Sequence, residues 1–155
     1  MSNILKRPQT NALCIGVFSA FYATLFFITA NHVEFTNLLY HIRLEQKANS
    51  FWNRWSSFLA AGNHRYIAMT LVAVTLFVVL LLLLRRKSYD EYHTHRLIGC
   101  LVVALVLTLI AIALFFLLVL SEPAGIVEKF MLFIVIHWAT VVLADLAYVL
   151  LCRWG

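Results

Sequence analysis

Four long apolar segments constrain this chain more than any other feature, and three of them contain no charged residue. They cover about residues 11–31, 66–84, 97–120 and 130–152. Each is close to the roughly 20 residues that an α-helix needs to cross a bilayer. Lipid offers no partner to backbone polar groups, so such segments cross membranes as helices. The sequence therefore predicts an all-α fold, an integral membrane four-helix bundle.

The composition excludes a soluble domain. Of the 155 residues, 63% are hydrophobic and 12% are charged, and a soluble chain of this size would still expose much of its surface to water. Four spans leave no room for a second folded unit, so residues 1–155 are predicted to form a single polytopic membrane domain. The net charge of +5 does not indicate nucleic acid, because the basic residues lie mainly at the ends of the apolar segments.

The long polar connection between the first two spans contains one amphipathic segment. Its aromatic and apolar residues recur at helical spacing: Phe51, Trp52, Trp55, Phe58 and Leu59. Asn49 or Ser50 is suited to begin a helix there, and Gly62-Asn63 to end it. Tryptophan rings favour the membrane–water interface. We therefore predict a short interfacial helix in the first outer loop.

The basic residues also predict the orientation. Seven lie in the N-terminal segment, the second connector and the C-terminus: Lys6, Arg7, Arg85, Arg86, Lys87, Arg96 and Arg153. Five are spread over the other two connections: Arg43, Lys47, Arg54, Arg65 and Lys129. Basic loops face the cytoplasm. We therefore expect a multi-pass protein of the cell membrane with both termini in the cytoplasm.

The fourth span contains Asp145, the residue that most suggests a site. Placing an aspartate near the bilayer centre costs roughly 2.5–3.5 kcal/mol on insertion scales, so such residues are functional candidates. No lysine or arginine lies within another span. Asp145 is therefore expected to bond to hydroxyl groups of neighbouring helices or to face a water- or ion-filled cavity. The binding candidates are Asp145, His137, Tyr22 and Thr108, and a purely structural contact between helices is the alternative role for Asp145.

Histidines near the outer ends of the spans suggest a second type of site. His32, His64 and His137 are weak candidates for metal or haem ligands, together with His41, but their spacing matches no ligand signature. No phosphate-binding glycine loop, G-x-S-x-G or HExxH motif is present. We therefore predict no cofactor, and the motifs leave open whether the chain is an enzyme.

The opening residues Leu5-Lys6-Arg7-Pro8, with Asn11-Ala12-Leu13 and Phe26-Phe27, resemble the first membrane helix of lipid A phosphoethanolamine transferases. That resemblance covers about thirty residues and implies no residue role and no function for this chain.

Two classes of function remain. The first is a non-catalytic component of a membrane assembly, or an oligomer that conducts a small solute or ion. The second is a membrane-bound enzyme or redox subunit that uses the outer histidines. A stripe of small residues on the first span, Ala12, Gly16 and Ala20, would let another helix approach closely. The expected partners are therefore the lipid bilayer and either further copies of the chain or other membrane subunits.

Overall fold

The computed structural model describes residues 7–31, 51–85, 89–121 and 126–153. Within these ranges the chain forms five helices and no strand: α1 (Pro8–Asn31), α3 (Phe51–Ala60), α4 (His64–Leu84), α5 (Glu91–Ser121) and α6 (Ile126–Arg153). All but α3 are long and apolar enough to cross a membrane. The predicted all-α membrane bundle of four helices is therefore confirmed.

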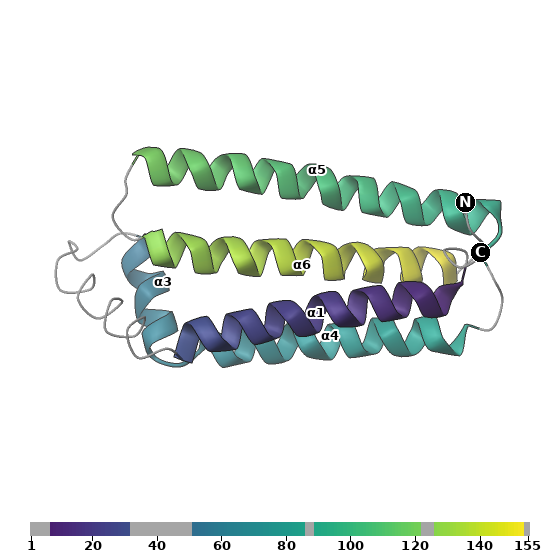
Figure 1. The fold of residues 1–155 in the computed structure, drawn as a ribbon, viewed down its shortest axis with the longest axis horizontal. Helices are drawn as coiled ribbons and strands as arrows, with labels where there is room; N and C mark the ends of the chain where they lie inside the picture. The colour runs from purple at the N-terminus through teal and green to yellow at the C-terminus, as the bar shows by residue number, and fades with distance from the viewer. Residues whose placement is uncertain (1–6, 32–50, 86–88, 122–125, 154–155) are drawn as a thin grey trace.

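The four long helices lie side by side and alternate in direction (Figure 1). The start of α1, the end of α4, the start of α5 and the end of α6 lie together at one end, which we call the connector end. Helix α3 runs across the opposite end, which we call the α3 end (Figure 1). Helix α1 packs mainly on α4, α5 packs mainly on α6, and both α4 and α1 also contact α6. Helix α6 therefore joins the two pairs.

The burial pattern explains why α6 is central. Its buried residues Met131, Ile134, Trp138, Val142 and Asp145 recur every three or four positions, so that one face points into the bundle. Helix α5 shows the opposite pattern, because Ala104 is its one buried residue. In a membrane its remaining apolar surface can face lipid, so α5 needs no second helical neighbour.

Helix α3 ends in a turn that requires glycine. Gly62 has a φ of 79°, which glycine adopts without steric cost. Its N–H bonds to the Leu59 carbonyl at 3.0 Å, and the Asn63 N–H bonds to the Phe58 carbonyl at 3.3 Å. These two bonds form a Schellman motif. The predicted Gly62-Asn63 stop is correct, whereas the predicted caps Asn49 and Ser50 lie outside the described residues.

Two helices begin a full turn or more before the predicted apolar segments. Helix α5 starts at Glu91, because the Asp90 carboxylate accepts the His93 N–H at 2.9 Å and so caps the first turn. Helix α6 starts at Ile126, which places Glu128 and Lys129 in a buried first turn instead of in a loop. Hydropathy detects the span but not the polar turn that extends it.

The small-residue stripe of α1 lies partly against α4. Ala12 is buried, and a Cβ atom at Gly16 would lie 3.9 Å from Val79 Cγ2. Ala20 is exposed. The first half of the stripe therefore supports the close approach of α1 and α4 within one chain.

Candidate functional site

Asp145 lies inside the bundle near the connector end, with 3% of its surface exposed. The Asn11 amide donates a hydrogen bond to Asp145 Oδ1 at 3.1 Å and so links α1 to α6. This contact differs from the expected bonds to hydroxyl groups. Helix α1 begins at Pro8, so the first turn of α1, and not its middle, lies at the depth of Asp145.

A cavity of about 480 Å³ lies beside Asp145, between α1, α5 and α6. Most of its wall is apolar, with Asp145, Asn11 and a few hydroxyl groups as the polar exceptions. Its lining comprises Thr10, Asn11, Cys14, Ile15, Phe18, Tyr89, Thr94, Leu97, Ile98, Leu101, Val141 and Asp145. Among the described residues no cationic side chain pairs with Asp145. A mostly apolar cavity with few polar groups is the usual form of a small-molecule site.

Tyr89 forms part of the cavity wall near the connector end. It is 4% exposed, its ring meets the Tyr148 ring edge-to-face at 5.6 Å, and the Arg85 guanidinium lies 5.7 Å from its centre. Burial raises the pKa of the Tyr89 phenol and the Asp145 charge adds to this, whereas Tyr148, Asn11 and Arg85 oppose it. Tyr89 therefore keeps its proton at neutral pH and remains a hydrogen-bond donor.

A chain of hydrogen bonds joins three helices in the middle of the bundle. The Trp138 indole N–H donates to Ser19 Oγ at 2.8 Å, and Ser19 Oγ lies 2.8 Å from Thr75 Oγ1. The Thr75 hydroxyl donates to the Leu71 carbonyl at 2.8 Å, so the Ser19 hydroxyl must donate to Thr75. Every donor in the chain has an acceptor. A fully satisfied network of this kind holds helices in one arrangement.

The predicted candidates Tyr22 and His137 contact each other. The Tyr22 hydroxyl lies 2.5 Å from His137 Nδ1, and the His137 ring also meets Phe18 and Phe133. This pair links α1 to α6 but does not reach Asp145, since eight residues of helix separate His137 from it, roughly 12 Å. Asp145 and His137 are therefore two separate positions.

Thr108 does not reach the depth of Asp145. The part of α5 that faces Asp145 runs from Thr94 to Leu101, and Thr108 lies seven residues further along, roughly 10 Å away. Helix α5 begins at Glu91, six residues before its apolar segment, so Thr108 lies farther from the connector end than the apolar limits alone indicate. The α5 residues that do border the cavity were therefore missed.

The histidine candidates do not assemble in the described part of the chain. His64 is buried at the start of α4, where its Nδ1 lies 3.3 Å from the Leu59 carbonyl, while His137 pairs with Tyr22. No group of three histidine, cysteine, aspartate or glutamate side chains close enough to hold a metal occurs among the described residues. His32 and His41 lie outside those residues.

Apolar layers separate the polar groups of the interior. Asp145 lies seven residues from Trp138 along α6, roughly 10 Å, and the fully buried Val142 and the 2% exposed Ile15 lie in the core of this region. Towards the α3 end, Phe26 and Met131 are fully buried. Among the described residues, the interior therefore contains no continuous polar path between the two ends.

A second buried carboxyl group lies at the α3 end. Glu128 is fully buried, and neither of its carboxylate oxygens has a hydrogen-bond partner among the described residues. The neighbouring α3 supplies the buried Ser56, whose hydroxyl likewise lacks a partner in that part of the structure. Trp55 donates its indole N–H to the Glu128 backbone carbonyl at 3.0 Å, which holds α3 against α6. Sequence reasoning missed Glu128, because it follows a proline–glycine turn and resembles a loop residue.

We expect Glu128→Gln to stabilise the bundle, because a buried charged group without a partner costs about 1–3 kcal/mol or more. The amide removes the charge and keeps the shape of the side chain. The free energy of unfolding in mixed detergent micelles should rise by about 1 kcal/mol or more. Glu91→Gln, at an exposed acid on α5, should change it by less than about 0.5 kcal/mol. A loss of stability in Glu128→Gln alone would mean that the carboxylate has a partner essential to folding.

The chain matches no protein-family model, and no curated protein and no solved structure is significantly similar to it. Its function therefore has to be argued from the geometry of the sites.

Proposed function

We propose that this multi-pass membrane protein is a non-catalytic carrier that binds a small amphiphilic cation in the cavity between α1, α5 and α6. The observation that carries this proposal is the position of Asp145. A carboxyl group that is 3% exposed, without a cationic partner among the described residues, forms part of the wall of a cavity of about 480 Å³.

The chemistry of the wall supports a cation with an apolar body. A buried carboxylate favours a positive charge close to it, because the attraction between charges grows as the local dielectric falls. Phe18 and Tyr89 add aromatic faces, which attract cations, and Leu97 and Leu101 add apolar surface. A strongly hydrated ion would lose its water shell against such a wall, whereas an organic cation loses little.

The place of the cavity supports access from the bilayer. Helices α1 and α5 lie on opposite sides of α6 and have no extensive contact with each other. The cavity between them is therefore open to the side, within the membrane leaflet at the connector end. An amphiphilic cation concentrates in the interfacial region of a bilayer, so this route supplies the ligand where the site lies.

The apolar layers of the interior favour a carrier over an open pore. Conduction through a channel needs a hydrated or polar lumen along its length, and the described interior has none between Asp145 and Glu128. Transfer across the membrane would therefore need a rearrangement of helices. Association with further copies of the chain remains part of the proposal, because α5 has most of its apolar surface exposed.

The direct test is binding of tetraphenylphosphonium to the purified protein in detergent, measured by equilibrium dialysis. A photoreactive analogue should label peptides of α1, α5 and α6 that border the cavity. Excess tetraphenylphosphonium should prevent this labelling. Absence of saturable binding, or labelling confined to other surfaces, would contradict the proposal.

We also propose that the connector end faces the cytoplasm and that the protein resides in the cell membrane. A cysteine at Ala61, which is exposed beside α3, should then react with an impermeant maleimide in intact cells. A cysteine at His95, exposed near the start of α5, should react only after the cells are opened. Both variants need a background without the native cysteines. The reverse labelling pattern would place the connector end outside.

A further inference from the structure

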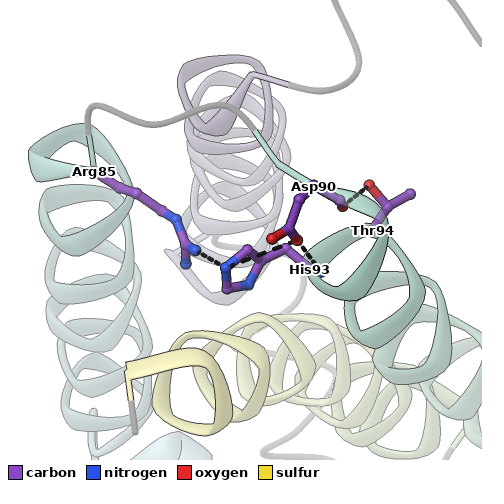
Figure 2. Close-up of polar contacts among 4 residues, drawn as sticks. All are labelled: Arg85, Asp90, His93 and Thr94. Atoms are coloured by element: carbon purple, nitrogen blue, oxygen red, sulfur yellow. Dashed lines mark hydrogen bonds and ion pairs between the residues drawn. The ribbon is translucent and has the colours of Figure 1, made fainter. Parts of the chain in front are cut away.

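Arg85, Asp90 and His93 form a polar contact between α4 and α5 at the connector end (Figure 2). Arg85 follows the last turn of α4, and its Nη2 contacts His93 Nε2 in the first turn of α5. Figure 2 shows the Arg85 side chain reaching across to the imidazole ring from the α4 side. Few other contacts join these two helices, so this contact makes a large contribution to holding α4 and α5 together.

The hydrogen bond defines the protonation state of His93. A guanidinium has only donors and stays charged at any physiological pH. His93 Nε2 must therefore accept, which requires a neutral imidazole with its proton on Nδ1. His93 Nδ1 is buried and has no partner among the described residues. The contact with Arg85 thus exists only while His93 is neutral.

A second partner for a protonated His93 lies nearby. Asp90 Oδ1 is 4.0 Å from the same nitrogen, Nε2, and already accepts the His93 backbone N–H. When Nε2 gains a proton it repels Arg85 and attracts Asp90. The imidazole then makes its ion pair within the first turn of α5, and Arg85 loses its acceptor.

The other described groups around His93 do not compensate its charge. On its own side of the contact, the Tyr89 and Tyr92 rings lie 6.5 and 5.6 Å from the imidazole. Helix α6 contributes the Tyr148 ring, 5.6 Å from the Tyr89 ring, and Asp145, whose charge acts on Tyr89. Helix α1 contributes the neutral Asn11, which also faces Tyr89. Arg85 is thus the nearest described cation and Asp90 the nearest described anion.

We propose that Arg85, His93 and Asp90 form an acid-sensitive latch, which links α4 to α5 when His93 is neutral and releases them when His93 is protonated. Histidine is the side chain that most readily gains a proton on mild acidification, so acidification opens the latch.

The latch adjoins the proposed binding cavity. The Arg85 guanidinium lies over the Tyr89 ring, and Tyr89 is part of the cavity wall. Release of Arg85 removes this support from Tyr89. We therefore infer that protonation of His93 weakens ligand binding. This consequence rests on the proposed function, whereas the latch does not.

The latch is tested by distances between spin labels on cysteines at Leu80 of α4 and His95 of α5, both exposed, in a background without the native cysteines. We expect a narrow distance distribution near pH 8 and a longer or broader one near pH 5. His93→Gln keeps an acceptor for Arg85 but cannot gain a proton, so the distance distribution in this variant should stay narrow at both pH values. Arg85→Gln removes the cation, so the distance distribution in this variant should be equally broad at both pH values.

Two results would contradict the proposal that these residues form a latch. One is a distribution in the parent protein that does not change with pH. The other is a His93→Gln variant that keeps the full response, which would assign the response to another group. Equal helix content by circular dichroism shows that both variants fold.

The effect on binding is measured as a ratio of affinities. Near pH 8 the parent and His93→Gln should bind tetraphenylphosphonium equally. Near pH 5.5 the parent should bind about fivefold more weakly than His93→Gln, the low end of ordinary coupling between sites. Protonation of Asp145 affects both proteins alike and cancels in the ratio. Equal affinities of the two proteins at both pH values would contradict the coupling between His93 and the binding site. Absence of binding in both proteins at pH 8 would contradict the proposed function but would not affect the test by spin-label distances.

Discussion

Asp145→Asn is expected to fold normally and to bind tetraphenylphosphonium at least about 30-fold more weakly than the parent protein. Loss of one partner from a buried charge pair costs about 2–5 kcal/mol, and each 1.4 kcal/mol is a factor of ten in affinity. Asparagine keeps the size of the side chain and can still accept the hydrogen bond from Asn11, so the link between α1 and α6 survives. Binding is measured by equilibrium dialysis near pH 8.

Two further variants separate binding from folding. Asp145→Leu removes the acceptor for Asn11 as well as the charge, so it should lose binding and also some thermal stability in detergent. Glu91→Gln neutralises an exposed acid at the same end of the molecule and should change neither property. Normal binding by Asp145→Asn would mean that the carboxyl group is only a structural contact between helices, which is the alternative that the sequence left open.

Trp138→Ala is expected to cause the largest loss of stability of any single substitution in the core. Trp138 is fully buried between α1, α4 and α6, and truncation of a buried tryptophan costs about 3–5 kcal/mol. The change also leaves Ser19 without its donor. The free energy of unfolding is measured in mixed micelles of a mild detergent and dodecyl sulfate, where membrane helices separate without losing their secondary structure.

Trp138→Phe isolates the hydrogen bond from the packing. It keeps an aromatic ring but removes the indole N–H, and interhelical hydrogen bonds in membranes contribute about 0.6 kcal/mol on average. The phenylalanine variant should therefore lose far less stability than the alanine variant. Leu143→Ala, on the same helix at a residue that is 52% exposed, should have little effect. Equal losses in Trp138→Ala and Leu143→Ala would show that α6 does not form the core described here.

Only part of the candidate site could be predicted from the positions of residues along each span. An aspartate in an apolar segment is visible from sequence, and so is the absence of lysine and arginine from the spans. The partner of Asp145 was not visible. Its depth was judged from the apolar limits of each segment, whereas α1 and α5 begin at Pro8 and Glu91. An error of one turn shifts a residue by roughly 5 Å, which is enough to replace a hydroxyl group by Asn11 as the nearest partner.

The cavity and the latch could not be predicted, for a different reason. Both depend on which helices are neighbours, and lipid provides no hydrophobic force that would select one neighbour over another. The α5 sequence is apolar on all sides, so its pattern does not show that it packs on α6 and leaves a space beside α1. The hydrogen bond from the His93 N–H to Asp90 is local to the start of α5, whereas the approach of Arg85 from α4 needs the tertiary arrangement.

By itself the sequence determined that this protein crosses a membrane as four helices with a short amphipathic helix between the first two. The physical reason is local: a long apolar segment in lipid must satisfy its backbone hydrogen bonds within itself, whatever its neighbours are. Only the tertiary structure decided that α6 is central, that Asp145 meets Asn11 beside a cavity and that Glu128 is buried where α3 packs on α6. Those features depend on small differences in packing between helices. The pattern of apolar residues along one helix does not predict these differences.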